Sequence, residues 1–134
     1  FGALGRFADA EPLYRRAYKE YGRSLGARHL HTLTGAYNLA IVLRAQGKLK
    51  EAEPLYNQAL RGREAELGPD HPDTLASTQS LAHLLQAQGR LDEAAPLFRR
   101  ALQGFEEQLG KSHPNTLACV HALAAVLEAQ GKPQ

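Results

Sequence analysis

The sequence predicts an all-α fold, built as a solenoid of about three helical repeats. Residues 47–88 and 89–130 align without a gap and share 22 identical residues in 42. Apolar residues recur at steps of three and four along the chain, and none of the apolar runs alternates with period two. At 134 residues the chain has room for about three units of this period. An apolar core distributed along the repeats therefore follows from the pattern.

The 42-residue period divides the chain into four segments of one solenoid. We expect a partial repeat at 1–31, full repeats at 32–73 and 74–115, and a partial repeat at 116–134.

The first predicted helix covers residues 7–25. Its apolar positions at helical spacing are Phe7, Ala10, Leu13, Tyr14, Ala17, Tyr18, Tyr21 and Leu25. Pro12 has no amide hydrogen, which costs little only near a helix start, so we expect the helix to begin within about five residues upstream. Pro54 and Pro96 place two further helices of this type, called B helices here. Residues 1–4 align with the last turn of a preceding helix, which makes Gly5 a turn residue.

A second type of helix, called A here, is predicted at 32–45, 74–87 and 116–129. A Leu-Gly pair before each one is typical of the end of the preceding B helix. Asp73, Asn115 and the threonine at each entry supply oxygens that can cap free amides. Gly47 and Gly89 then make the tight A-to-B turns, in a conformation that other residues adopt at a cost.

Leucines and small residues alternate on the predicted core faces. Tyr14, Tyr56 and Phe98 share one position in the repeat, and their spacing indicates a place in the core. Cys119 aligns with Gly35 and Ser77, which are small residues where helices pack. A buried structural thiol is therefore favoured over a nucleophile.

Composition excludes several classes of partner. With 16 basic and 14 acidic residues the net charge is +2, which argues against nucleic acid or a membrane surface as the main partner. The single cysteine cannot form an intrachain disulfide and makes a cytosolic setting the default. No apolar run approaches the roughly 18 to 20 residues that cross a bilayer.

Four motifs repeated in register resemble the tetratricopeptide repeats (TPRs) of the 42-residue kind found in kinesin light chains and nephrocystin-like proteins. They are NLA at 38–40, QGKLKEAEPLY at 46–56, the ALxxxE pattern at 59–64 and LGPDHPDTL at 67–75. The resemblance covers essentially the whole chain. It implies antiparallel helix pairs stacked in a right-handed superhelix, with A helices lining a concave groove that binds a protein or peptide.

Carried over position by position, the resemblance implies a groove formed by one face of each A helix. The candidate groove residues are Thr34, Tyr37, Asn38, Ile41, Arg44, Gln79, Ser80, His83, Gln86, His121 and Glu128, with the alanines 76, 118, 122 and 125 on the same face.

Asn38 holds the position from which an asparagine in related repeats grips a peptide backbone. Ser80 and Ala122 replace it later in the chain. Kinesin light chains use several basic residues for acidic cargo, whereas Arg44 is the only basic residue among these groove positions. The class of the bound peptide therefore stays open.

Catalytic and metal sites are not predicted, and no cofactor is expected. His29, His71 and His113 recur once per repeat in the same loop, so they cannot converge on one ion and are interpreted as loop structure. The sequence has no phosphate-binding loop, paired catalytic carboxylates or dinucleotide fingerprint. His83 and His121 do not recur in register, and both recognition and solvated surface stay open for them.

The favoured function is a non-catalytic scaffold that binds a peptide or partner surface in the groove. The alternative is self-assembly, because neither end of the chain reads as a polar cap. Phe7, Tyr14 and Tyr18 at one end, and Leu123 and Leu127 at the other, are expected to be partly uncovered. An end-to-end contact between copies would then join the first B helix to the last A helix.

Overall fold

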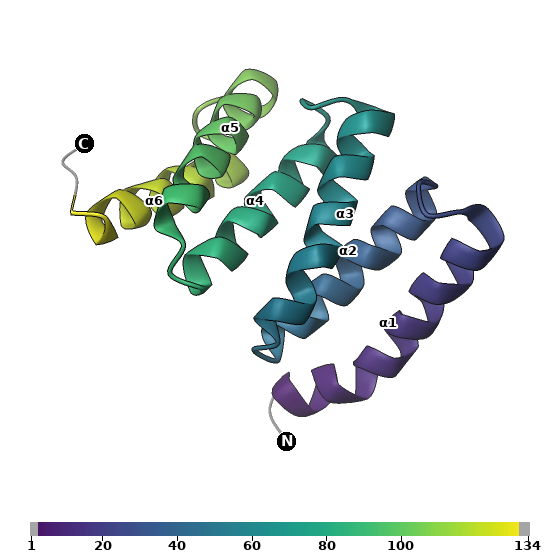
Figure 1. Ribbon diagram of the computed structural model, residues 1–134. Coiled ribbons are helices and arrows are strands. Elements are labelled where there is room, and N and C mark those ends of the chain that lie inside the picture. Colours follow the sequence, from purple (N-terminus) through teal and green to yellow (C-terminus); the bar gives the residue numbers. More distant parts are fainter. Residues whose placement is uncertain (1–2, 132–134) are drawn as a thin grey trace. The chain divides into compact units, whose positions relative to one another are not determined.

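Six helices and no strand are found among residues 3–131, the part of the chain that the computed structural model describes (Figure 1). In order they are α1 (Ala3–Leu25), α2 (Leu30–Ala45), α3 (Leu49–Leu67), α4 (Pro72–Ala87), α5 (Leu91–Leu109) and α6 (Pro114–Ala129). The predicted all-α fold is confirmed. The A helices are α2, α4 and α6, and the B helices are α1, α3 and α5.

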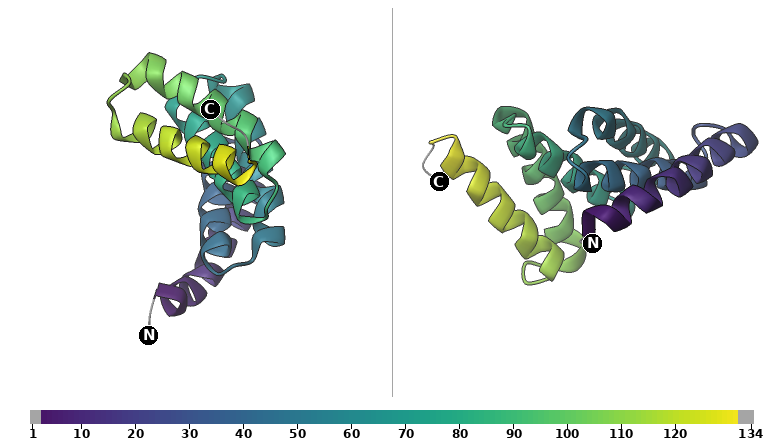
Figure 2. Two further views of the ribbon diagram at one scale, coloured as in Figure 1. Left: turned by 90° about the vertical axis from the view of Figure 1, so that its left-hand side faces the viewer. Right: turned by 90° about the horizontal axis from the view of Figure 1, so that it is seen from below.

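The chain divides into two compact units, Phe1–Glu66 and Leu67–Gln134. The first holds α1, α2 and nearly all of α3, and the second holds α4, α5 and α6. In the first, α1 packs on α2, and in the second α5 packs on both α4 and α6 (Figure 2). Short turns join consecutive helices, so neighbours within a unit run antiparallel.

Each A helix begins two residues earlier than predicted, because a histidine caps it. The Nδ1 atoms of His29, His71 and His113 accept hydrogen bonds from the backbone N–H two residues later, at 3.1, 3.0 and 3.1 Å. Capping by the side-chain oxygens of Asp, Asn or Thr was therefore the wrong prediction. Loop structure, expected for these histidines, is confirmed.

Proline follows two of the three capping histidines, whereas His29 precedes Leu30 and is equally extended, with ψ 143°. Pro72 and Pro114 stand at the first turns of α4 and α6, where a missing N–H costs nothing. A residue before proline is held in the extended region, and His71 has ψ 140°. The entry threonines close the loop instead, since Thr32 and Thr116 donate their hydroxyls to the carbonyls of Gly26 and Gly110 at 2.7 and 2.8 Å.

The first B helix differs from its prediction at its start. α3 and α5 begin five residues before their prolines, as expected, but α1 begins at Ala3 and runs through Gly5. In the second repeat the corresponding turn is held by N–H bonds of Gly47 and Lys48 to Arg44 and Leu43. The matching carbonyls before α1 belong to residues 1 and 2, which lie outside the described residues. The other two residues of the expected preceding turn, Ala3 and Leu4, belong to α1.

Leucine against glycine sets the contact between each A helix and the B helix that follows it. A Cβ built on Gly104 of α5 would lie 2.5 and 2.7 Å from the δ carbons of Leu75 on α4. One built on Gly62 of α3 would lie at least as close to Leu33 on α2. Both leucines are 1% exposed. The helix axes can approach this closely only because glycine carries no side chain.

The alanines expected at close helix contacts are buried on α2 to α5, whereas Ala124 of α6, expected to pack in the same way, is partly exposed. Ala40, Ala52, Ala59, Ala82, Ala94 and Ala101 are all fully enclosed. Tyr56 and Phe98 are also fully buried, as predicted, but Tyr14 at the same repeat position is 39% exposed. This exposure departs from the core position that its spacing indicated and agrees with the expectation that Tyr14 is partly uncovered, because among the described residues no A helix packs on that side of α1.

Glu11 ties α1 to the turn between α2 and α3. Its carboxylate accepts from Arg15 Nε at 2.8 Å, from Lys48 Nζ at 2.9 Å and from Gln46 Nε2 at 2.9 Å. The bonds from Lys48, Arg15 and Gln46 lower the pKa of Glu11 to about 2. Gln130 at the end of α6 donates in a similar way to Asp92 in the first turn of α5, at 2.6 Å.

Gly62→Ala is predicted to lower the free energy of unfolding by about 1 to 3 kcal/mol, because the new methyl group overpacks Leu33. Gly22→Ala in α1 is the matched control, since a Cβ there meets its nearest neighbour, Thr32 Cγ2, at 3.9 Å. The control should be neutral or gain up to about 1 kcal/mol from helix propensity. Urea unfolding of both variants makes the comparison, and equal effects would show that the Leu33 contact is not tight.

Glu11→Gln is predicted to cost about 1 kcal/mol of stability at neutral pH, after allowance for solvent screening of these partly exposed partners. The folded-state pKa lies below the ordinary 4.5, so the carboxylate stabilises the fold fully above that value. Its contribution disappears as pH falls from 4.5 towards 2. Unfolding curves across this range should show the two proteins converging in acid. A stability difference that stays constant with pH would rule out the charged contact as its source.

Candidate functional site

Five candidate residues form one stripe along α2. They follow each other at steps of three, one, three and three and are called the α2 stripe below: Thr34, Tyr37, Asn38, Ile41 and Arg44. Thr34 and Arg44 are exposed, and the other three are partly exposed. The opposite positions of the same helix are buried. The stripe is therefore accessible to a partner.

Tyr37 is held in place by two residues of α3. Its ring centroid lies 6.0 Å from that of Tyr56, with the planes at 74°. The guanidinium carbon of Arg63 lies 4.6 Å from the centre of the Tyr37 ring, a distance at which a cation is attracted to an aromatic face. Arg63 Nη2 also lies 3.5 Å from Thr34 Oγ1. These contacts restrict the ring of Tyr37 while part of its surface stays open.

The hydroxyl of Tyr56 lies beneath this surface and has no hydrogen-bond partner in the structure. Burial raises the pKa of Tyr56, and the nearby Arg44 opposes the shift. Phe98, the counterpart in α5, has no such group, so this polar atom is specific to the first unit.

On α4 the candidate residues are Gln79, Ser80, His83 and Gln86, all partly exposed. The ring of His83 lies 4.9 Å from that of Phe98 on α5, at 79°. An A-helix ring thus stands edge-on to the B-helix aromatic in each unit, although Tyr37 and His83 occupy different repeat positions.

On α6 the candidates His121 and Glu128 are exposed. Ala122, expected on the same face, is buried. The candidate residues of α6 are thus two polar side chains separated by two turns.

Arg63 is the functional candidate that the sequence reasoning missed. It is buried at a repeat position where α1 has Tyr21 and α5 has Phe105. The sequence did hold a signal for it, because a charged residue stands at a repeat position that is aromatic in the other two B helices. A buried arginine requires partners, and Tyr37 and Thr34 are among those it contacts.

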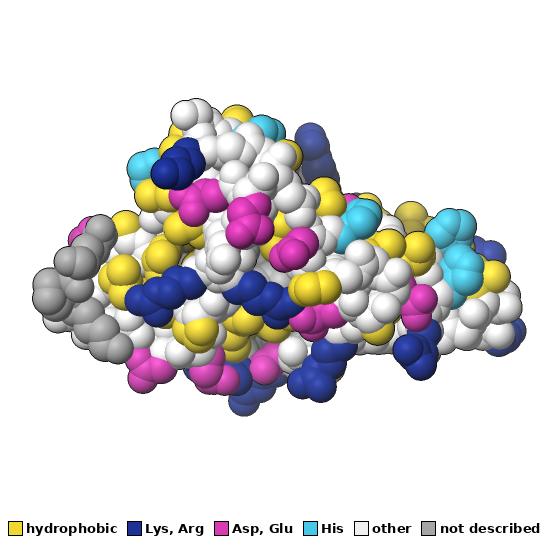
Figure 3. Space-filling view, turned by 90° about the horizontal axis from the view of Figure 1, so that it is seen from above, with side chains coloured by type: hydrophobic (Ala, Val, Ile, Leu, Met, Phe, Trp, Pro, Cys, Tyr) yellow, Lys and Arg dark blue, Asp and Glu magenta, His cyan; other side chains and the backbone are white. Residues whose placement is uncertain are grey.

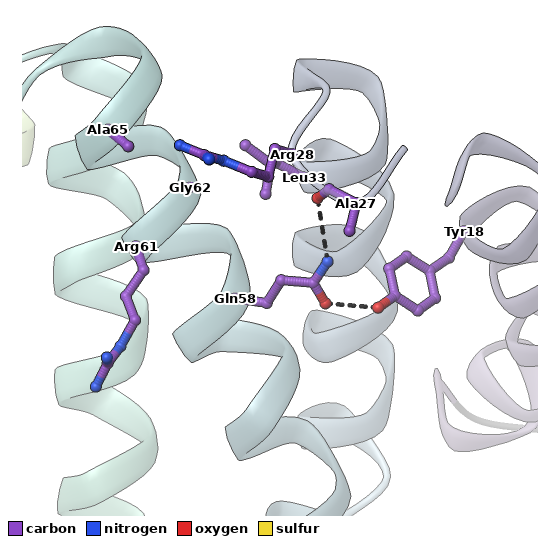
Figure 4. Close-up of a pocket in the computed structure, with 8 residues that line it drawn as sticks. All are labelled: Tyr18, Ala27, Arg28, Leu33, Gln58, Arg61, Gly62 and Ala65. Carbon is purple, nitrogen blue, oxygen red and sulfur yellow. Dashed lines mark hydrogen bonds between the residues drawn. The ribbon is translucent and has the colours of Figure 1, made fainter. Parts of the chain in front are cut away.

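A hollow of about 490 Å³ opens between α1 and α3 on the B-helix side of the first unit (Figure 4). Tyr18 on α1 donates its hydroxyl to Gln58 Oε1 at 2.5 Å, and Gln58 Nε2 donates to the carbonyl of Ala27 at 3.4 Å. Arg28 reaches toward α3, where its guanidinium lies 3.8 Å from Glu66. The polar groups of this hollow are thus largely engaged with each other.

Cys119 is buried among Leu75, Ala101 and Phe105, with Leu102 beside them. Burial raises the pKa of its thiol to about 11, so the reactive thiolate is scarce at neutral pH. The expectation of a buried structural thiol is confirmed.

The described surface carries charges of both signs. On the face drawn in Figure 3, basic and acidic side chains are interspersed with hydrophobic ones. Among residues 3–131 no cluster of three His, Cys, Asp or Glu side chains could hold a metal ion. Within the same range, none of the helices combines the length and apolar character that crossing a bilayer requires.

Cys119 is predicted to react with a thiol reagent roughly 100-fold more slowly in the folded protein than in urea, because it must wait for local opening. The measurement is the rate of disulfide exchange with an aromatic disulfide at pH 8. Reaction at the rate of a free cysteine would show that α4 and α5 do not cover this thiol of α6.

The sequence matches the tetratricopeptide repeat family over residues 1–65, 34–102 and 74–134. These three overlapping matches cover the chain from end to end. No curated protein matches the sequence.

Solved structures with the same fold come from kinesin-light-chain-like proteins. One structure holds the nearly identical TPR-like repeats of a protein described as a kinesin light chain from Podosopora anserina. It is 30% identical in sequence to this chain and superposes with a TM-score of 0.90, and the match covers 96% of this chain and 61% of that chain. Another is BtubC (BKLC) from P. vanneervenii, at 24% identity and TM-score 0.86, with 95% and 51% covered. The second supports the fold alone. The chain spans about three-fifths or less of the length of these proteins.

Proposed function

Since the chain belongs to the tetratricopeptide-repeat family, whose repeats generally mediate protein–protein interaction or assembly, we propose that it is a protein-binding module. Such folds are typically non-catalytic scaffolds. The proposed binding surface is the exposed face of the A helices, and a peptide segment or a partner surface is the proposed ligand. We also propose that the chain is one solenoid, with repeats at 32–73 and 74–115 between partial repeats at 1–31 and 116–134. The proposed location is the cytosol.

The observation that carries the proposal is the restrained ring of Tyr37 on the α2 stripe. Rigid aromatic residues contribute strongly to protein interfaces because little conformational entropy is lost when they are covered. Tyr56 and Arg63 already restrict this ring. Asn38, next to it, offers a donor and an acceptor that match one peptide group.

The candidate residues differ in charge from one A helix to the next. Arg44 on α2 presents a guanidinium that suits a carboxylate of the ligand. On α4 the proposed contacts are neutral: Gln79, Ser80, His83 and Gln86. On α6 they are His121 and Glu128. This mixed pattern favours a ligand without a strong charge of one sign.

Self-assembly is the second candidate function, and one observation favours it. Apolar side chains of α6 are exposed, with Leu117 at 44% and Val120 at 42%. Exposed apolar faces are where proteins bind other proteins.

The variant Tyr37→Ala with Asn38→Ala is predicted to lose about 1 to 3 kcal/mol of binding free energy, because an aromatic contact and hydrogen bonds are removed. Ligands would first be selected for the wild-type chain on a peptide array and by pull-down, and affinities then measured by calorimetry. The single variant Asn38→Ala changes a partly exposed position and keeps Tyr37. It therefore tests the binding surface even if removing Tyr37 disturbs folding.

Arg99→Ala on the exposed side of α5 serves as the control and should bind like wild type. Circular dichroism would confirm that all variants remain helical. Normal binding by the Tyr37 and Asn38 variant, together with loss of binding in the control, would contradict the proposed surface.

A further inference from the structure

The histidines that precede the three A helices share one geometry. His29, His71 and His113 have φ angles of −68°, −63° and −65° and ψ angles of 143°, 140° and 142°. In each of them Nδ1 accepts the backbone N–H of the residue two positions later, at 3.0 to 3.1 Å. The three A helices of the described chain therefore start on the same imidazole hydrogen bond.

This hydrogen bond requires a neutral imidazole. A ring nitrogen that accepts a hydrogen bond holds no proton, so the proton of each capping ring lies on Nε2. In an imidazolium both nitrogens are donors, and Nδ1 would then face a backbone N–H donor. The positive charge would also stand at a helix N-terminus, where the peptide dipoles already place a positive partial charge. Protonation of a capping ring therefore breaks the cap.

The charged groups beside the caps differ from one repeat to the next. Arg28 is next to His29, Asp70 and Asp73 flank His71, and Lys111 stands two residues before His113. These groups lie within two residues of their histidine, so they act on the imidazole in the unfolded chain as well as in the folded one. The cap hydrogen bond is what folding adds at all three sites.

Other elements bring few titratable groups to these loops. The ring of His31 lies 5.1 Å from that of His29, and Tyr21 of α1 lies 5.6 Å from His31. From α3, Glu66 reaches the first loop, where it lies 3.8 Å from Arg28.

At the second loop the group that α5 supplies is neutral, because Gln108 donates to the carbonyl of Asp70. The cap of His71 therefore has no charged group from α5 among these contacts.

We propose that the three histidine caps form one pH-sensitive device, in which mild acid releases the starts of all three A helices together. The unfolded chain accepts protons that the capped chain refuses, so stability rises with pH across the imidazole range. Imidazole ordinarily titrates between about pH 5 and 8. The stability that the caps provide is therefore complete above this range and is lost as the pH falls through it.

The device is separate from the acid response of Glu11, whose pKa of about 2 lies below the ordinary 4.5. That carboxylate acts below pH 4.5, where the caps are already protonated. The device also needs no ligand, so it can fail while the proposed binding surface holds. The A helices carry all the candidate binding residues, and the same acid step thus acts on the helices that hold this surface.

The test replaces the three caps together by His29→Asn, His71→Asn and His113→Asn. Asparagine is among the strongest capping residues and does not titrate. Between pH 7.5 and 5.5 the thermal midpoint of the wild type should fall by roughly 5 °C or more. The midpoint of the cap variant should stay nearly constant over this range. A cap variant that keeps the pH dependence of the wild type would overturn the proposal.

The other three of the six histidines supply the matched control. The variant with His31→Asn, His83→Asn and His121→Asn removes as many imidazoles but keeps every cap. It should retain the pH dependence of the wild type, whatever its midpoint at pH 7.5. Equal loss of this dependence in the control and the cap variant would show that the caps are not its source, and the proposal would be wrong.

A spectroscopic measurement on the control variant keeps the proposal testable even if the cap variant does not fold. Its three remaining imidazoles are the capping ones, so their ring nitrogens are observed without overlap by ¹⁵N NMR. At pH 7.5 each should show the form protonated on Nε2. The backbone N–H signals of positions 31, 73 and 115 should shift together with the rings on acidification. A proton on Nδ1 at neutral pH, or amide signals that do not follow the rings, would overturn the proposal.

Discussion

The fold depends on one contact, a leucine of the A helix seated against a glycine of the B helix that follows. The contact between Leu75 and Gly104 leaves no room for a methyl group, so it sets how closely the two helices approach. The buried alanines of both helices follow from that distance, because larger residues would separate the axes. Shape, more than hydrophobicity alone, thus selects which helix pairs with which.

The same close approach brings side chains of the B helix up to the exposed side of the A helix. In the first unit Arg63 uses this proximity to reach Tyr37, and in the second Phe98 reaches His83. The framework is shared between the units, and the residues it presents are different. Recognition can vary on this fold without any change in how the helices pack, which agrees with function residing in residues placed on a common scaffold.

Local patterns allowed the six helices to be predicted, because helical periodicity and glycine stops depend only on near neighbours. Burial was less predictable: Tyr14 and Phe98 share a register, but only Phe98 has a helix packed over it. The histidine caps were missed because imidazole is not among the usual capping groups, although His71 before Pro72 was a visible signal. The exposure of Arg44 could be predicted from helical periodicity. The contact of Arg63 with Tyr37 could not be predicted, since it depends on the separation of two helices.

Gly62 and Gly104 have a consequence for how such repeats diverge. Codons GGA and GGG become the glutamate codons GAA and GAG by one base change, and Glu20 stands at this repeat position in α1. A single point mutation can therefore replace the glycine that seats a leucine by a side chain that cannot lie against it. Helix pairing in this architecture is thus open to change by substitution as well as by gain or loss of whole repeats.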